Sequence, residues 1–378
     1  MKRILFYESR PEWGGAQKCE LELLAALDHQ DSMETFFVTS TDGPMNSRVK
    51  ASGKNVTLIP INKTVNGIRK GQVPTGIFFL LFQLLQMIPH LLKVSSFILK
   101  NRIHLIYTSQ FRSQLIIGWL AKMLGRKVIW HIHGEEQLTN PLGKICVTMA
   151  DQIIVVSHLL SEKYQSQFPK QKEKFIVVHN GVEITSPGRK KENPMFTLSM
   201  VGTLIEGKRQ DLAILACAEL RKLGYHVHLN IIGEKPPWHS DEYKHSLNKL
   251  MNQLDISESV SFLGWIENPW EPLLHSNVFI LPSDTEGMPL SIIEAMALGL
   301  PCISTNVGGV PELIEDGKTG FLIGPGSAAE LVEKLIILLE QPVLCEWMGQ
   351  QALARYEAHF TKKSFVKGVA GVINTIYS

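Results

Sequence analysis

Short apolar runs alternate with amphipathic stretches along almost the whole sequence, and this alternation limits the possible folds more than any other feature. Buried parallel strands read as continuous apolar runs, whereas covering helices place apolar residues three or four positions apart. The first half predicts strands at Ile4–Tyr7, Thr35–Thr39, Val56–Ile59, Leu105–Thr108, Val128–His131, Ile153–Ser157 and Phe175–His179, and helices at Ala16–Leu27, Gln114–Leu124 and Ser161–Phe168. This order predicts a parallel sheet with helices on both faces.

Residues 181–194 interrupt the alternation, because they are rich in glycine, proline and charge and have no apolar period. Such a stretch is typical of a linker. The alternation then resumes with predicted strands at Thr197–Val201, His228–Ile232, Val260–Leu263, Val278–Leu281 and Cys302–Ser304, and helices at Asp211–Leu223, Pro289–Leu298 and Ala328–Leu339. A chain of 378 residues exceeds the usual size of one domain. The sequence therefore predicts two α/β domains of similar size.

The composition excludes several classes of protein. The net charge of +2 is too small to indicate a nucleic-acid partner. The five cysteines are scattered, with no CxxC pair and no His/Cys spacing of a metal site. An odd, dispersed set of this kind favours reduced thiols in a cytoplasmic protein. No secretory signal is visible, because Met1-Lys2-Arg3 leads directly into the first apolar run.

Residues 76–99 form the most apolar segment, but Gln83, Gln86, Pro89 and Lys93 interrupt it. A membrane-spanning helix needs about 20 predominantly apolar residues, so a clean span is not expected. Two interpretations remain. The segment is either a helix packed against the sheet edge, or a helix that lies on a membrane with the help of nearby basic residues at positions 69, 70, 93 and 100.

The loop Trp13-Gly14-Gly15-Ala16 follows the first predicted strand and precedes a helix. Glycines at this point let backbone N–H groups approach an anion, and the helix N-terminus adds a favourable dipole. A tight turn that needs glycine is the alternative explanation. The loop lacks the GxGxxG pattern, which counts against a dinucleotide-dependent dehydrogenase.

The segment from Ser283 to Gly299 carries the strongest signal for a binding site. A strand ends before it, and Pro289 suits the first position of a helix. The backbone around Gly287, Met288, Pro289 and Leu290 is then expected to meet a phosphate. Glu286 stands just before this helix. Glu294 lies among apolar residues of the helix, where a carboxylate needs donors such as two ribose hydroxyls. The alternative is a capping glutamate followed by a salt-bridged one.

These residues carry a resemblance to a known family. Glu286-x7-Glu294, with Glu-Gly-x-Pro and Glu-Ala-Met-Ala-x-Gly-x-Pro around it, resembles the signature of the retaining GT-B glycosyltransferases of family four. The continuation from Asn306 to Gly320 is similar as well, and the first half matches more weakly at Gly14-Gly15, His133-Gly134, Val156-Ser157, Asn180-Gly181-Val182 and Val201-Gly202.

The resemblance implies an α/β fold of GT-B architecture, in which two Rossmann-like domains face each other across a cleft. Residues 1–185 are then expected to form the acceptor-binding domain and residues 186–355 the nucleotide-sugar-binding domain. Residues 356–378 are expected to form a C-terminal helix that packs back on the first domain.

The resemblance also implies roles for single residues. Glu286 would contact the hydroxyls of the donor sugar, and Glu294 the ribose. Lys208 would neutralise the diphosphate, the Gly15 backbone would contact the distal phosphate, and His133 would face the transferred sugar. For His133 a structural role is the alternative, since a histidine at the end of an apolar strand is often structural. His131, two residues earlier, is expected on the same face of the strand.

The phosphate site departs from the family pattern at one position. Many members have arginine directly after the glycine that matches Gly202, but here the residue is Thr203. Arg209, next to Lys208, is the candidate replacement for that cation. Gly233 ends a predicted strand where a nucleotide base could be held, or it forms an ordinary turn.

The expected reaction is transfer of a hexose-type sugar with retention of configuration, and nucleotide diphosphate sugar enters as substrate and not as cofactor. No DxD motif is placed to bridge a metal and a diphosphate, so no metal is expected to be required. The resemblance favours a glycan or lipid-linked acceptor in bacterial surface polysaccharide synthesis, in the cytoplasm or on the cytoplasmic face of the inner membrane. A nucleotide-sugar 2-epimerase and a non-catalytic nucleotide-sugar-binding subunit are the alternatives.

Overall fold

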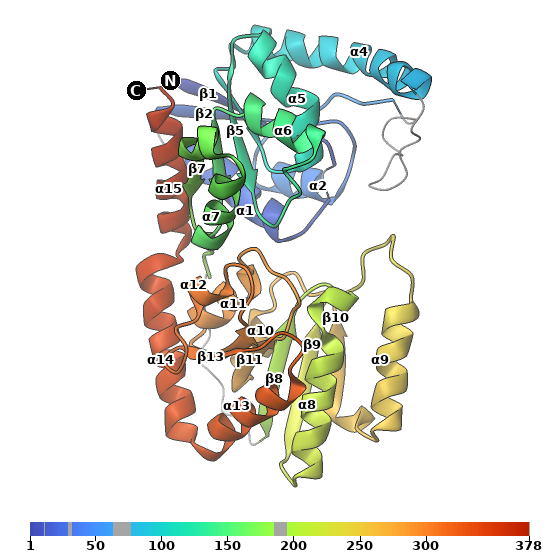
Figure 1. The fold of residues 1–378 in the computed structure, drawn as a ribbon, viewed down its shortest axis with the longest axis vertical. Coiled ribbons are helices and arrows are strands. Elements are labelled where there is room, and N and C mark those ends of the chain that lie inside the picture. The colour runs from blue at the N-terminus through green and yellow to red at the C-terminus, as the bar shows by residue number, and fades with distance from the viewer. Residues whose placement is uncertain (11, 29–31, 63–76, 185–194, 378) are drawn as a thin grey trace. The chain divides into compact units, whose positions relative to one another are not determined.

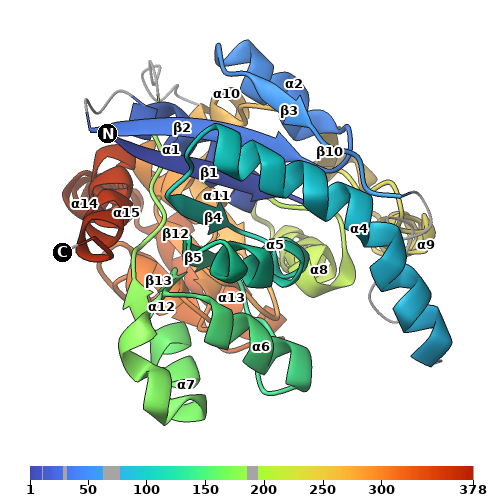
Figure 2. The same cartoon turned by 90° about the horizontal axis from the view of Figure 1, so that it is seen from above.

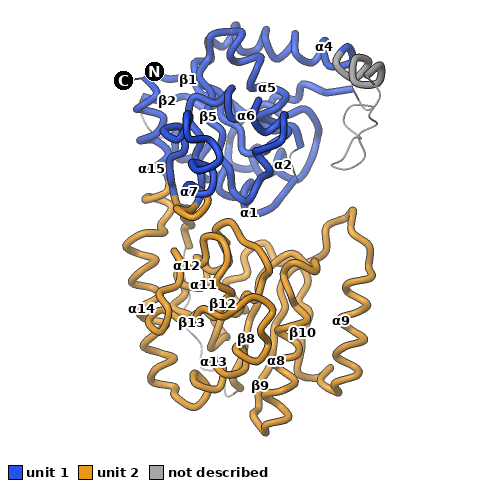
Figure 3. The backbone as a smooth tube through the Cα atoms, in the orientation of Figure 1, with its two compact units in different colours: residues 1–156, 161–178, 366–378 blue, residues 157–160, 179–365 orange. Residues whose placement is uncertain are grey.

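The computed structural model describes residues 1–10, 12–28, 32–62, 77–184 and 195–377, with the side chains of 77–84 excepted. The chain forms two compact units (Figure 3). Unit 1 comprises residues 1–156, 161–178 and 366–378, and unit 2 comprises 157–160 and 179–365. The chain therefore passes between the units more than once.

Unit 1 contains a seven-stranded parallel sheet (Figure 1) in the order β3-β2-β1-β4-β5-β6-β7. Its strands are β1 (Lys2–Glu8), β2 (Met33–Thr39), β3 (Val56–Leu58), β4 (Leu105–Thr108), β5 (Lys127–Ile132), β6 (Gln152–Val155) and β7 (Phe175–Val177). The helices that follow these strands are α1 (Gly15–Asp28), α2 (Pro44–Ala51), α4 (Ile77–Lys100), α5 (Phe111–Met123), α6 (Pro141–Met149) and α7 (His158–Gln167). Helices α5 and α6 lie side by side in both views (Figures 1 and 2).

Apolar strands are buried because helices cover them. Leu5 and Tyr7 of β1, Ile106 of β4 and Val128 of β5 belong to one buried cluster, to which α4 and α5 add apolar side chains. Removing such side chains from water is the main favourable term in folding. All seven strands predicted for this half are present, with ends that differ by at most two residues.

Unit 2 contains a six-stranded parallel sheet in the order β10-β9-β8-β11-β12-β13. Its strands are β8 (Phe196–Val201), β9 (Val227–Ile232), β10 (Val260–Gly264), β11 (Val278–Leu281), β12 (Cys302–Thr305) and β13 (Gly320–Ile323). Its helices are α8 (Gln210–Lys222), α9 (Glu242–Gln253), α10 (Trp270–Leu274), α11 (Leu290–Ala297), α12 (Val310–Leu313), α13 (Ala328–Glu340) and α14 (Pro342–His359). The prediction of two Rossmann-like α/β domains is confirmed.

Several local predictions need correction or fall outside the described residues. Pro289 does not occupy the first helical position: it caps α11 from an extended conformation with ψ 122°, and the helix begins at Leu290. Strand β13 was not predicted, because it begins with Gly320, glycine is uncommon in strands, and only three of its four residues are apolar. Of the predicted linker, residues 185–194 lie outside the described residues.

The C-terminal region consists of two helices, α14 and α15 (Lys362–Thr375). The break falls at Phe360 and Thr361, and Thr361 forms a β-bridge with Val182. Gly181 lies so close to this break that a Cβ atom would stand 2.3 Å from the Thr361 carbonyl oxygen. Residues 356–365 belong to unit 2, and the chain rejoins unit 1 at Val366.

Helix α4 contains Pro89 and carries the apolar segment noted in the sequence. Val94 and Ile98 of this helix are buried in the core of unit 1. Within the described ranges, no helix is both long enough and apolar enough to cross a membrane. The side chains of Phe78, Phe79 and Phe82, three apolar residues of this segment, lie outside the described residues.

Candidate functional site

Both sheets have the strand order in which ligands bind at one defined point. In open parallel sheets of this order, the point lies beyond the carboxyl ends of the two central strands, where the chain direction of the connections reverses. In unit 2 these strands are β8 and β11, which are hydrogen-bonded neighbours. The loop after β8 contains Gly202 and Lys208, and the loop after β11 contains Glu286. The two segments singled out in the sequence thus start from adjacent strands.

Lys208 and Glu286 meet directly. The Lys208 Nζ atom donates a hydrogen bond to the Glu286 Oε1 atom at 2.6 Å. The Glu286 side chain is 7% exposed and that of Lys208 is 23% exposed, so water screens this ion pair only in part. The Asp284 N–H donates to the Gly207 carbonyl at 2.9 Å and fastens the two loops beside the pair. The structure brings the predicted phosphate-binding cation and the predicted sugar-binding carboxylate together.

Glu294 is placed on α11, where its residue is only 5% exposed. Its neighbours in the helix, Ile293 and Ala295, are fully buried. A carboxylate with so little exposure requires hydrogen-bond donors. Its predicted contact with a ribose stays a prediction.

Glycines allow the loops of unit 2 to approach one another closely. Gly233 has φ +142°, and a Cβ atom there would lie 1.9 Å from the Gly202 carbonyl oxygen. Gly308 has φ +53°, and a Cβ atom there would lie 1.7 Å from the carbonyl oxygen of Glu286. The Gly309 N–H donates to the Gly287 carbonyl at 2.7 Å. A side chain at Gly233 would displace the loop after β8, and one at Gly308 would displace the loop that carries Glu286.

Asn180 holds the same loop from another side. Its Nδ2 atom donates to the Met288 carbonyl at 3.0 Å, and its backbone N–H donates to the Met288 sulfur at 3.3 Å. The supporting roles of Asn180, Gly308 and Gly309 were missed in the sequence. All three belong to the stretches that carry the family resemblance, but the sequence does not show which loop each one touches.

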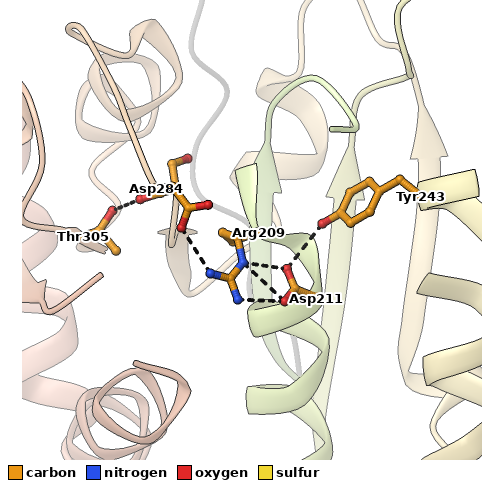
Figure 4. Close-up of polar contacts among 6 residues, drawn as sticks. Arg209, Asp211, Tyr243, Asp284 and Thr305 are labelled. Atoms are coloured by element: carbon orange, nitrogen blue, oxygen red, sulfur yellow. Dashed lines mark hydrogen bonds and ion pairs between the residues drawn. The ribbon is translucent and has the colours of Figure 1, made fainter. Parts of the chain in front are cut away.

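Arg209 is engaged by two carboxylates (Figure 4). Its guanidinium binds both oxygens of Asp211 at 3.0–3.3 Å and Oδ1 of Asp284 at 3.1 Å. The hydrogen bonds to Asp211, followed by that to Asp284, raise the pKa of Arg209. The Tyr243 hydroxyl also donates to Asp211, at 3.3 Å. The positive charge of Arg209 is therefore balanced within the protein, which weakens the case for it as a second phosphate-binding cation.

In unit 1 the corresponding loops follow β1 and β4. Helix α1 begins at Gly15, and both Gly14 and Gly15 are exposed. His133 directly follows β5, and its ring stacks on that of His131 with centroids 3.9 Å apart. The expectation that both rings share one face is confirmed. His131 contacts the Tyr107 hydroxyl, and burial, followed by the charge of His133, lowers its pKa well below the usual range.

A pair of buried acids was not found in the sequence. Glu8, at the end of β1, and Glu20, on α1, are both completely buried. The Ser109 hydroxyl lies 2.5 Å from Glu8 Oε1 and 2.6 Å from Glu20 Oε2. One hydroxyl has a single hydrogen for two acceptors, so one of the acids must carry a proton. Burial accordingly raises the pKa of Glu20 to about 7. The three residues tie α1, and the Gly14-Gly15 loop before it, to the sheet.

Comparison with known proteins assigns the family. Residues 183–355 match the family model described as glycosyl transferases group 1, and residues 13–186 match the one described as Glycosyltransferase Family 4. The chain belongs to the GT-B glycosyltransferases. Together the two models account for nearly all of both α/β units.

Among curated relatives of this glycosyltransferase, an uncharacterized glycosyltransferase of Haemophilus influenzae is 30% identical over 60% of the chain and 63% of its own length. A putative colanic acid biosynthesis glycosyltransferase, WcaL of Escherichia coli K12, is 30% identical over 56% of the chain and 51% of its own length. The matched part of these relatives is thus less than two thirds of each. The crystal structure of Anabaena HepE in complex with UDP and glucose is similar in fold, with a TM-score of 0.79, 19% identity, and coverage of 99% and 100% of the two chains.

Proposed function

We propose that the protein transfers a hexose-type sugar from a nucleotide diphosphate donor to a glycan or lipid-linked acceptor, with retention of configuration, in bacterial surface polysaccharide synthesis. The observation that carries this proposal is the Lys208–Glu286 ion pair. It lies on the loops that follow β8 and β11, the two central strands between which the order of the sheet reverses. The relative named for colanic acid biosynthesis supports a role in polysaccharide synthesis. The UDP and glucose bound by the similar Anabaena protein favour UDP as the nucleotide of the donor.

The chemistry follows from charge. When the sugar leaves, negative charge builds up on the phosphate oxygens of the departing nucleoside diphosphate. Lys208 supplies a positive charge there, and the first turn of α11 supplies backbone N–H groups after Gly287. Glu286 would accept hydrogen bonds from the sugar hydroxyls and fix the ring for reaction. The acceptor oxygen then attacks the face that the diphosphate leaves, forms the new glycosidic bond and gives its proton to an oxygen of the departing phosphate.

A panel of UDP-, GDP- and ADP-sugars tests this proposal. We expect one nucleotide series to raise the melting temperature, and the corresponding labelled sugar to appear in a product or, slowly, as free sugar. Conversion of the donor into its epimer would instead indicate a nucleotide-sugar 2-epimerase. Binding with no turnover in the presence of membrane and glycan extracts would indicate a non-catalytic subunit.

Chelation is expected to leave transfer nearly unchanged, because the cationic help comes from Lys208 and backbone amides. Initial rates are compared before and after EDTA treatment at saturating donor. A strict requirement for manganese or magnesium would contradict this model of the phosphate site.

Replacing Glu294 with glutamine is expected to weaken donor binding more than turnover. A ribose contact contributes similarly before and during reaction, so its loss changes KM and leaves kcat nearly intact. A hydrogen bond to a charged group contributes about 1.5–3 kcal/mol, so donor KM should rise on the order of tenfold to a hundredfold. Steady-state kinetics at saturating acceptor measure both constants. A loss confined to kcat would contradict the assignment.

We also propose that α4 contacts the cytoplasmic face of the membrane. Leu85, Ile88, Leu92 and Leu99 are 63%, 45%, 65% and 53% exposed and recur at helical spacing on one face. Lys93 and Lys100 are exposed beside them, which suits an anionic lipid surface.

Replacing Leu85, Ile88 and Leu92 together with serine should release the protein from phosphatidylglycerol vesicles. The melting temperature should stay nearly unchanged, because all three side chains are exposed. Sedimentation with vesicles and a thermal melt check the two parts. Replacement of the buried Val94 by serine is the contrast, since it should lower the melting temperature. Vesicle binding that survives the triple change would contradict the membrane contact.

A further inference from the structure

A second cluster of ligand-type side chains lies apart from the Lys208–Glu286 pair. His158 is the first residue of α7, His179 follows β7 after Val178, and Glu312 lies on α12. One potential metal-ligating atom from each residue lies within 4.8 Å of those of the other two. Within the described ranges, no other group of three or more such residues reaches this proximity. All three residues belong to unit 2.

The cluster is held in place by its neighbours. The Glu312 Oε1 atom accepts a hydrogen bond from the Leu159 N–H at 3.2 Å, and its Oε2 atom lies 2.8 Å from His179 Nε2. Asn180 is bonded to Met288, which fixes the backbone next to His179. The backbone N–H thus holds one carboxylate oxygen, while the other contacts His179. Hydrogen bonds of this kind orient the ligands of metal sites.

The donor set of two imidazoles and one carboxylate indicates the chemical class of ligand. It suits zinc, which binds His nitrogen at about 2.0–2.1 Å and Asp or Glu oxygen at about 2.0–2.2 Å with four ligands. Tetrahedral bonds of that length separate the ligand atoms by about 3.3 Å. The His179–Glu312 contact would open slightly to reach this value, and His158, which is exposed, can move inward.

We propose that His158, His179 and Glu312 bind one zinc ion, with water as the fourth ligand. Arg355 donates to the Glu312 backbone carbonyl but forms an ion pair with Glu315, so its charge is compensated. The two histidines stand within two residues of positions where the chain passes between the units. The ion would tie these two crossing segments to α12. Its role is structural, and no step of sugar transfer uses it.

Metal occupancy of the full-length protein tests this site. The protein is stripped with EDTA, dialysed against zinc chloride and measured by mass spectrometry of the metal, and cobalt(II) is added separately to record its visible absorption. We expect one zinc per chain, an intense tetrahedral cobalt spectrum and a melting temperature that rises with zinc.

His158→Ala is the decisive variant, because the ring is exposed and the His179–Glu312 hydrogen bond remains in it. It should weaken zinc binding at least about tenfold, abolish the cobalt spectrum and melt like the parent without zinc. His226→Ala, at another exposed histidine of unit 2, is the matched control and should bind zinc normally. Glu312→Gln should also lose zinc.

Two results would overturn the proposal. The parent protein could bind no zinc, which would leave a hydrogen-bonded His–Glu pair that orients the start of α7. Equal zinc binding by the parent and His158→Ala would indicate adventitious binding at surface histidines. The experiment measures metal content and not sugar transfer, so either result would leave the proposed glycosyl transfer standing. Failure of the transfer assay would likewise not bear on the zinc site.

Discussion

Glu286→Ala is expected to lower kcat by about a hundredfold or more, while the nucleoside diphosphate still binds. The carboxylate would hold the sugar whose bond to phosphate is breaking, so its loss harms the transition state more than the bound donor. The structure adds a reason for intact nucleotide binding. In the parent protein the Lys208 Nζ atom donates a hydrogen bond to Glu286 at 2.6 Å. In Glu286→Ala this carboxylate no longer competes with phosphate for the lysine. The dissociation constant of the nucleotide should therefore stay equal or fall.

Calorimetric titration with the nucleoside diphosphate and single-turnover transfer measure the two effects separately. Asp284→Asn is a suitable control, because it removes a carboxylate from the loop that carries Glu286. The Asp284 carboxylate pairs with Arg209 and not with Lys208. It should retain most of the activity. Near-normal kcat in Glu286→Ala would contradict the assigned role. If Glu294→Gln then lost kcat instead, the two glutamates would have exchanged roles.

The fold could be predicted from the sequence wherever local pattern and burial agree. Strand β4 and strand β11 have the predicted bounds, because runs such as Val278–Leu281 are buried on both faces and have to be apolar throughout. Helix α9 was missed, since most of its residues are polar and it buries only Leu247 and Met251. The two C-terminal helices were not separated, because the break at Phe360 depends on the contact of Thr361 with Val182 and Gly181.

Some residues of the candidate site could likewise be predicted from the sequence, and others could not. Glu286 and Glu294 could be proposed from a motif that places them eight positions apart, and Lys208 from the family pattern. The partners of Arg209 could not, because Asp284 lies 75 positions away in the sequence and meets it only in the folded chain. The protonation of one acid of the Glu8 and Glu20 pair likewise depends on Ser109, which stands 101 and 89 positions away from them. Side chains in long-range contact decide which charges remain available to a ligand.

Lys208→Met is expected to reduce kcat/KM by about 100- to 1,000-fold, which corresponds to removal of one preorganised charged donor at the departing group. Unlike Glu294→Gln, it should impair both donor binding and turnover, because phosphate charge is present before reaction and increases during it. It also leaves the Glu286 carboxylate, whose side chain is 7% exposed, without its partner. Removing one member of a buried ion pair costs more than removing both. The single variant should therefore also melt at a lower temperature.

The double variant Lys208→Met, Glu286→Gln separates the catalytic contribution of the pair from its structural one. It should recover most of the melting temperature lost in Lys208→Met, because no unpaired charge remains, yet it should show no more transfer than either single variant. A double-mutant cycle on stability and on kcat/KM gives the two coupling energies. If transfer returned together with the melting temperature, Lys208 would serve only to stabilise the loops. Unchanged activity in all three variants would remove this pair from the proposed site.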